Sequence, residues 1–128
     1  MADEIDVGYH LSLNKSAGTG TLKFEKEVKR GRQLDDQSTA KKVSNTQTVG
    51  TTHEALALGD VTTPGWSVFT NLDATNFVEI GIDVTGTFHP FVKIKPGVEH
   101  PPVYLNTTAP YARADTADVE LDYTILEQ

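Results

Sequence analysis

Strict alternation of apolar and polar side chains near both ends of the chain most constrains its fold. Apolar residues occupy every second position from 5 to 13, and again from 119 to 125. A β-strand places every second side chain on the same face, so each run predicts a strand with one face toward a core. Thr, Val and Ile together number 34, against 20 for Ala and Leu, and β-branched residues favour pleated sheets over helices. The sequence therefore predicts an all-β protein.

Further strands are expected between these two runs. Leu22, Phe24 and Val28 predict a strand that forms a β-hairpin with the first one through a turn over residues 14–20, whose glycines tolerate positive φ. Short runs bounded by turn residues predict strands over residues 43–49, 67–72, 77–84, 88–95 and 103–105. The six prolines fall between or at the ends of these strands, and the one helical candidate, residues 53–58, is too short to stand alone. We expect a single-domain β-sandwich or jelly roll of about eight strands spanning residues 1–128.

The composition excludes several classes of function. The 128 residues include no cysteine, which excludes a disulfide scaffold, a Cys-ligated zinc site, an iron–sulfur cluster and a thiol nucleophile. A net charge of −7 argues against non-specific binding to nucleic acid or to an anionic membrane. The first thirteen residues have no basic start and no apolar h-region, so we expect a soluble chain synthesised in a cytoplasm.

The charge is unevenly distributed along the chain. Residues 23–42 carry seven basic and four acidic side chains, a net charge of +3, which leaves −10 on the remainder. The basic members are Lys23, Lys26, Lys29, Arg30, Arg32, Lys41 and Lys42. One interpretation is two solvated faces, and a second is that this segment of one copy meets an acidic surface on a neighbour and sets the register of an oligomer. A third, nucleic-acid binding, lacks interleaved aromatic residues beyond Phe24.

Catalytic and metal-binding patterns are missing from the sequence. The four histidines, His10, His53, His89 and His100, match neither a helical zinc pair nor a closely spaced His-x-His pair, and we expect them to be exposed and structural. Glu79 and Asp83 share the polar face of one expected strand about 13 Å apart, too far for a glycosidase pair or for one metal ion. The serines lack a nucleophile elbow and the glycines form no phosphate-binding loop. We expect no enzyme activity and no cofactor, and a cupin-like metal enzyme would need histidines clustered in a barrel mouth.

Two further sets of residues each allow two interpretations. Asp73 is expected to close an Asx-turn with the backbone near Thr75 or Asn76, and a calcium site with loop carbonyls is the alternative. The aromatic residues are expected in the core, although exposed rings could stack on sugars. They are Trp66, Phe69, Phe77, Tyr104 and Tyr111.

The middle of the chain resembles a known group of proteins. The segments that carry the resemblance are VGTTHEAL (49–56), LGDVTTPGW (58–66), NLDATNFVEIG (71–81), FVKIKPG (91–97) and LDYTILE (121–127). They are similar to small virion structural proteins of tailed bacteriophages, in particular the capsid decoration, or cement, proteins. The resemblance covers most of residues 49–127, whereas residues 1–48 carry little of it.

The resemblance implies a β-sandwich or jelly-roll protein that sits on the capsid surface of a virion after synthesis in the host bacterial cytoplasm. Its implied partner is the major capsid protein, and a homo-oligomer, with a trimer favoured on a capsid lattice, would bind there. A tail or head-fibre component, or a receptor-binding or carbohydrate-binding β-sandwich module, is the alternative. The seven basic residues of segment 23–42 and residues 1–4 with the first strand are the expected contact elements. Reversal of Lys29, Arg30 and Arg32 to Glu is expected to abolish particle binding without unfolding the domain.

Overall fold

The protein is all-β over the residues that the structure describes. This computed structural model describes residues 4–18, 20–27, 33–35, 37 and 39–128, and within them it contains strands, turns and no helix. The described residues form twelve strands, more than the expected eight or so. The chain divides into two compact units, residues 1–37 and residues 38–128, which are described separately. The expectation of one domain over residues 1–128 stays a prediction.

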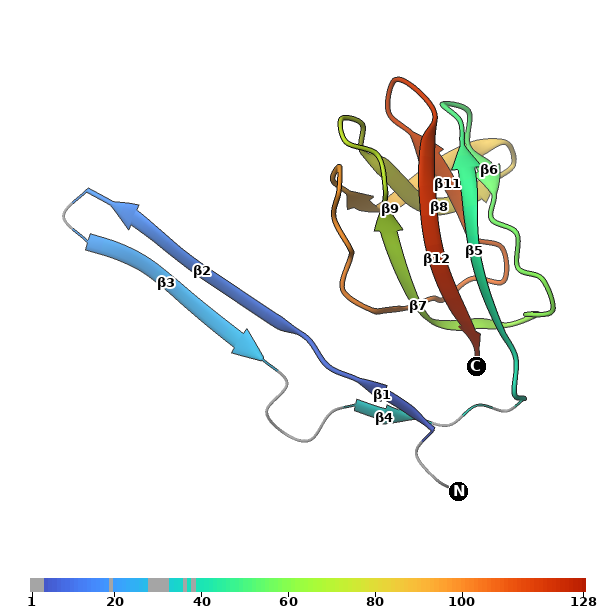
Figure 1. Cartoon of the computed structure of the whole chain (residues 1–128), viewed down its shortest axis with the longest axis horizontal. Coiled ribbons are helices and arrows are strands. Elements are labelled where there is room, and N and C mark those ends of the chain that lie inside the picture. The colour runs from blue at the N-terminus through green and yellow to red at the C-terminus, as the bar shows by residue number, and fades with distance from the viewer. Residues whose placement is uncertain (1–3, 19, 28–32, 36, 38) are drawn as a thin grey trace. The chain divides into compact units, whose positions relative to one another are not determined.

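The second unit is a β-sandwich of two four-stranded sheets, as Figure 1 shows. One sheet has the strand order β10-β7-β12-β5, and its strands are β5 (Lys42–Val49), β7 (Pro64–Asn71), β10 (Val103–Tyr104) and β12 (Val119–Glu127). The other has the order β6-β11-β8-β9, with β6 (Glu54–Ala55), β8 (Val78–Val84), β9 (Thr87–Ile94) and β11 (Tyr111–Ala114). Every pair of neighbouring strands in both sheets is antiparallel. The predicted β-sandwich is thus confirmed.

The core between the two sheets follows the alternation of the sequence. In β12 the side chains of Val119, Leu121, Tyr123 and Ile125 are buried, whereas Glu120 and Asp122 between them are exposed. Burial of such a row on one face removes apolar surface from water and is the main driving force for closing the sandwich. The rings of Tyr123 and Phe69 pack with centroids 6.2 Å apart. Strand β12 lies between β5 and β7, which explains why its pattern is the most regular.

One local expectation for the sandwich is wrong, and one is refined. Residues 53–58, too short to stand alone as a helix, form no helix: Glu54 and Ala55 pair with Ala112 and Tyr111 as strand β6. The expectation for the prolines fails at one position. Pro90 lies inside β9 rather than at a strand end. Because β9 is an edge strand, a residue without an N–H donor is tolerated there.

A β-bulge in β9 fixes the shape of this edge. Ile80 pairs with Val92 and Gly81 pairs with Pro90, so Phe91 is the extra residue of the bulge. A Cβ atom at Gly81 would overlap the backbone of His89 and would lie 2.7 Å from Cα of Pro90, so only glycine fits beside the bulge. The hairpin turn that joins β8 to β9 has positive φ at Thr85 and Gly86, as a two-residue turn of type I′ requires.

The first unit consists of two short antiparallel ribbons. One pairs β1 (Ile5–Val7) with β4 (Gln33–Asp35), and the other pairs β2 (His10–Ala17) with β3 (Gly20–Glu27). The predicted β-hairpin therefore exists, but its strands continue to Ala17 and from Gly20, so most of the expected turn over residues 14–20 is strand. The expected continuous strand over residues 5–13 is interrupted at Gly8 and Tyr9. We call the β2–β3 ribbon the hairpin.

Candidate docking surface

One face of the hairpin carries a row of exposed apolar side chains. Leu13 on β2 lies directly opposite Phe24 on β3, Leu11 lies opposite Lys26, and Lys15 lies opposite Leu22. Directly opposed residues share a face, as do residues two apart along a strand. We call these six residues, Leu11, Leu13, Lys15, Leu22, Phe24 and Lys26, the hairpin face.

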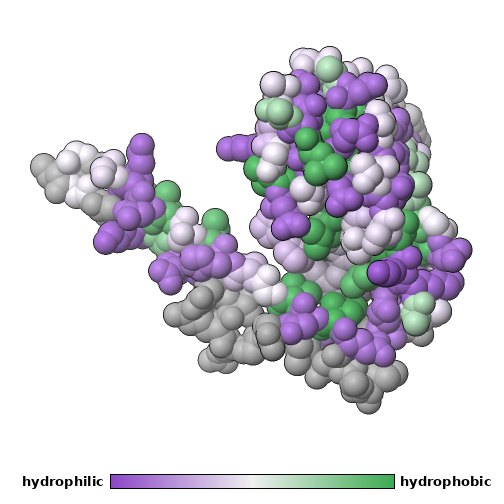
Figure 2. Space-filling model, viewed as in Figure 1, coloured by the Kyte–Doolittle hydropathy of each residue, from purple (hydrophilic) through white to green (hydrophobic). Residues whose placement is uncertain are grey.

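The apolar members of the hairpin face are exposed to an unusual degree for their size. Leu11 is 62% exposed, Leu22 57%, Phe24 51% and Leu13 46%. Hydrophobic residues are visible on the surface of the hairpin in Figure 2. Scattered apolar residues are ordinary on protein surfaces, but a contiguous apolar row marks an interaction site. The expectation that the apolar residues of the N-terminal run point into a core is wrong for Leu11 and Leu13.

A two-stranded ribbon has no means of covering its own apolar face. Isolated hairpins are marginally stable in water, and a third strand or a packed partner is needed to bury one face. The hairpin is a two-stranded sheet among the described residues, with no third strand paired to either edge. The arrangement therefore suits a segment whose apolar face becomes buried against another surface.

The opposite face of the hairpin is polar. It carries Ser12, Asn14 and Ser16 from β2 and Lys23 and Glu25 from β3. Lys23 and Lys26 are three residues apart on one strand, so they belong to opposite faces. The hairpin face thus combines four apolar side chains with two lysines, and among the described residues it has no carboxylate.

The structure places the predicted basic residues in several different surroundings. Lys23 and Lys26 lie on opposite faces of β3, whereas in the second unit Lys42 is the first residue of β5 and Lys41 directly precedes it. Lys29, Arg30 and Arg32 lie outside the described residues. Only Lys26 of the described members shares a face with the exposed apolar row. Sequence reasoning named the basic residues but missed the apolar row. The signal was a hairpin register that pairs Ala17 with Gly20, because this register places Leu13 opposite Phe24.

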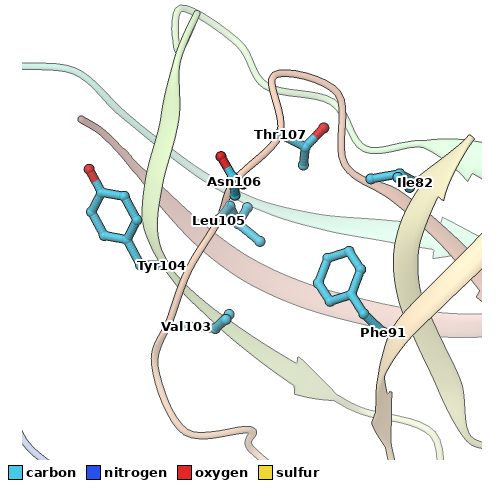
Figure 3. A pocket seen from close by; sticks show the side chains of 7 residues that line it. All are labelled: Ile82, Phe91, Val103, Tyr104, Leu105, Asn106 and Thr107. Atoms are coloured by element: carbon cyan, nitrogen blue, oxygen red, sulfur yellow. The ribbon is translucent and has the colours of Figure 1, made fainter.

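The sandwich has a second exposed apolar feature, a groove at the edge of β9. Figure 3 shows its lining side chains, which come from β8, β9 and the segment that begins at β10. They are Ile82, Phe91, Val103, Tyr104, Leu105, Asn106 and Thr107, around a volume of about 290 Å³. Phe91 is the bulged residue and is 52% exposed, and Tyr104 is 43% exposed. The bulge therefore turns an aromatic ring toward this groove.

The two carboxylates singled out in the sequence, Glu79 and Asp83, contact different basic side chains. Oδ1 of Asp83 lies 2.7 Å from Nε2 of His53, and Oε1 of Glu79 accepts a hydrogen bond of 2.8 Å from Arg113. The ring of Phe88 stacks on His53, with centroids 5.4 Å apart, and the Arg113 guanidinium lies 4.8 Å from the same ring centroid. The hydrogen bond with His53, aided by the Gly86 N–H, holds the pKa of Asp83 below its ordinary value. These contacts join His53 to Asp83 and Arg113 to Glu79 around the ring of Phe88.

Asp73 forms the expected Asx-turn. Its carboxylate accepts hydrogen bonds from the backbone N–H groups of Thr75 and Asn76, and these bonds lower the pKa of Asp73. The carboxylate of Asp73 therefore stabilises its own turn through backbone donors. Over the described ranges, no group of three or more His, Asp or Glu side chains is placed to hold a metal ion.

The expected core position of the aromatic residues holds for only one of the five. Phe69 is buried, but Tyr104 is exposed and Trp66, Phe77 and Tyr111 are half-buried. Tyr104 pairs with Trp66 across β10 and β7, and their rings meet edge to face with centroids 5.2 Å apart. Since Phe69 faces the core, Trp66 three residues earlier on β7 must face outward.

Within the part of the chain that the structure describes, no helix is long and apolar enough to cross a membrane. Comparison with protein-family models, with curated proteins and with solved structures finds no match to this chain. The function is therefore argued from the residues and their arrangement.

Proposed function

We propose that the chain is a non-enzymatic virion structural protein of a tailed bacteriophage, namely a capsid decoration protein that binds the major capsid protein and stabilises the head. The resemblance of residues 49–127 to this group is one support. The stronger support is the exposed apolar hairpin face, because it is a surface made for binding a macromolecule. In the sandwich, the described carboxylates of Asp83, Glu79 and Asp73 are held by His53, by Arg113 and by backbone N–H groups of the turn after Asp73, respectively.

A repeating lattice suits the geometry of such a protein. The sandwich supplies a stable body, and the hairpin supplies a narrow ribbon that can lie on a partner surface. A small contact of this kind is weak on its own, but several linked copies bind a lattice far more tightly than one copy. We propose a homo-oligomer, with a trimer favoured, on the capsid surface.

The test measures occupancy on particles. Heads of the encoding phage are purified after disruption of this gene, incubated with the purified protein and sedimented through sucrose. The expected result is that the protein sediments with the heads and saturates at a fixed ratio to the major capsid protein. Protein that remains in the supernatant with heads, while binding isolated tails or fibres, contradicts a decoration role.

One observation favours a second function, a receptor-binding or carbohydrate-binding module of a tail or head fibre. Phe91 and Tyr104 are exposed beside the groove of the sandwich, and exposed aromatic rings are suited to stacking on sugars. Glycan-array binding that is lost in both Phe91→Ala and Tyr104→Ala supports this alternative. Absence of glycan binding together with saturable binding to heads supports decoration.

A further inference from the structure

We propose that the hairpin face docks on an apolar surface of the major capsid protein that is bordered by carboxylates, with Lys15 and Lys26 meeting those carboxylates. This inference rests on the proposed function and names the chemistry of its partner surface. Three features of the hairpin carry it: the area of its apolar row, the sign of the charges beside that row, and the lack of a carboxylate among the described residues of that face.

The area of the apolar row indicates a weak single contact that needs repetition. An aromatic side chain buries roughly 150 to 250 Å² when fully covered and a leucine buries less, so four such side chains that are about half exposed offer at most roughly 400 Å² per copy. Counting both partners gives roughly 800 Å², below the roughly 1,200 Å² of stable specific interfaces. A hairpin of this size therefore holds a partner when several copies bind together, which a capsid lattice permits.

The charges beside the row indicate the sign of the partner surface. Lys26 lies beside Leu11 and Lys15 lies beside Leu22, so the two lysines are at opposite ends of the row. A lysine can pack its aliphatic stem on apolar surface while its ammonium group reaches the rim. Carboxylates at the rim of the partner surface would therefore pair with both lysines and set the register of docking.

A second copy fits the hairpin face less well. Two hairpin faces stacked on one another would bring four lysines and no carboxylate around one small apolar core, and like charges at a docking site are costly. The sandwich of a neighbouring copy is acidic, with a net charge of −6 over residues 38–128. Its apolar groove, however, is lined by Asn106 and Thr107 and by no carboxylate. Neither the hairpin face nor the groove of a second copy therefore combines apolar surface with carboxylates for Lys15 and Lys26, which favours a different protein as the partner.

The decisive experiment compares two lysines on the same strand. Lys26→Glu changes the hairpin face, and Lys23→Glu makes the same change on the opposite face. Binding to heads is measured by sedimentation for both variants and for the wild type. We expect Lys26→Glu to weaken binding at least tenfold and Lys23→Glu to weaken it less than threefold. Equal effects of the two variants overturn the inference.

A second pair of variants tests the apolar row. Leu13→Thr with Phe24→Thr removes the central apolar pair while keeping residues that favour strands, and Ser12→Thr with Glu25→Gln is the matched change on the opposite face. We expect at least a tenfold loss of binding for the first and less than a threefold change for the second. Thermal melts followed by the fluorescence of Trp66, the one tryptophan, verify that the sandwich remains folded in each variant.

The remaining outcomes separate this inference from the proposed function. Wild-type protein that does not bind heads refutes the proposed function, whereas heads that bind all four variants equally refute only the docking inference. A wild-type oligomer that dissociates in the Leu13→Thr and Phe24→Thr variant would assign the face to a second copy. Protection of Leu13 and Phe24 from hydroxyl radicals in the free monomer would assign it to the chain's own sandwich, and co-sedimentation with anionic lipid vesicles would assign it to a membrane. Each of these three results overturns the inference.

Discussion

Replacement of Gly81 by alanine is expected to destabilise the sandwich severely. The added Cβ would meet three backbone atoms of β9, namely O and C of His89 and Cα of Pro90, the last at 2.7 Å. Ordinary contacts of a Cβ atom start near 3.4 Å, so the edge strand must move by more than half an ångström or abandon the bulge. Because the obstacles are backbone atoms and not flexible side chains, relaxation is limited. We expect a loss of about 3 kcal/mol, the upper end of the range for overpacked sites.

The assay for this prediction is unfolding followed by circular dichroism and by the fluorescence of Trp66 on β7. For a unit of 91 residues, about 3 kcal/mol corresponds to a fall in Tm of roughly 12 to 24 °C. Gly50→Ala is the matched control, because a Cβ there would meet only Oδ1 of Asp118 at an ordinary 3.6 Å and Gly50 has no positive φ. A Gly81→Ala protein within about 0.5 kcal/mol of the wild type would refute the argument from the bulge.

Two further predictions concern buried polar side chains of the same unit. Asn71 is buried, and its side chain donates to the carbonyl oxygens of Asn76 and Ile94 and accepts from the N–H of Asp73. Asn71→Ala is therefore expected to lower the free energy of unfolding, measured by urea titration, by about 2 to 3 kcal/mol. A loss no larger than that of the exposed control Asn106→Ala would contradict this. The carboxylate of Glu127 accepts hydrogen bonds from the hydroxyl of Thr62 and from the N–H groups of Thr62 and Thr63, which hold the pKa of Glu127 below its ordinary 4.5. A carboxyl group whose pKa is lowered in the folded state stabilises the fold above about pH 4.5, and this contribution is lost as the pH falls through the folded pKa. The wild type should therefore lose its stability advantage over Glu127→Gln on acidification from pH 7. An advantage that grows on acidification would contradict this.

The sandwich could be predicted from the sequence because its signals are local. The alternation in β12 and the short apolar runs of β5, β7, β8 and β9 place each strand to within a few residues. A run bounded by turn residues is sufficient for such a prediction, since a strand needs only the right periodicity and a face to bury. The bulge at Phe91 could not be found in this way, because it depends on the register of β9 against Gly81 in another strand.

Contacts between distant segments account for most of what sequence reasoning missed in the sandwich. His53 and Asp83 are thirty residues apart, and they meet because β11 pairs with β6 on one side and with β8 on the other. Neither residue has a local pattern that indicates the other. The outward position of Trp66, in contrast, could have been predicted. Side chains alternate between the two faces of a strand, so in β7 Trp66 must face away from the core if Phe69 faces into it.

The N-terminal alternation shows how a correct pattern can lead to a wrong environment. An apolar row at every second position predicts that a strand will bury one face, but this periodicity does not indicate which surface will cover that face. In β12 the partner is the facing sheet of the same unit, whereas Leu11, Leu13, Leu22 and Phe24 remain exposed on a two-stranded ribbon. A two-stranded ribbon can bury such a row only against another surface, which is the basis of the docking that we propose. The same alternation therefore marks the core at one end of the chain and the proposed docking surface at the other.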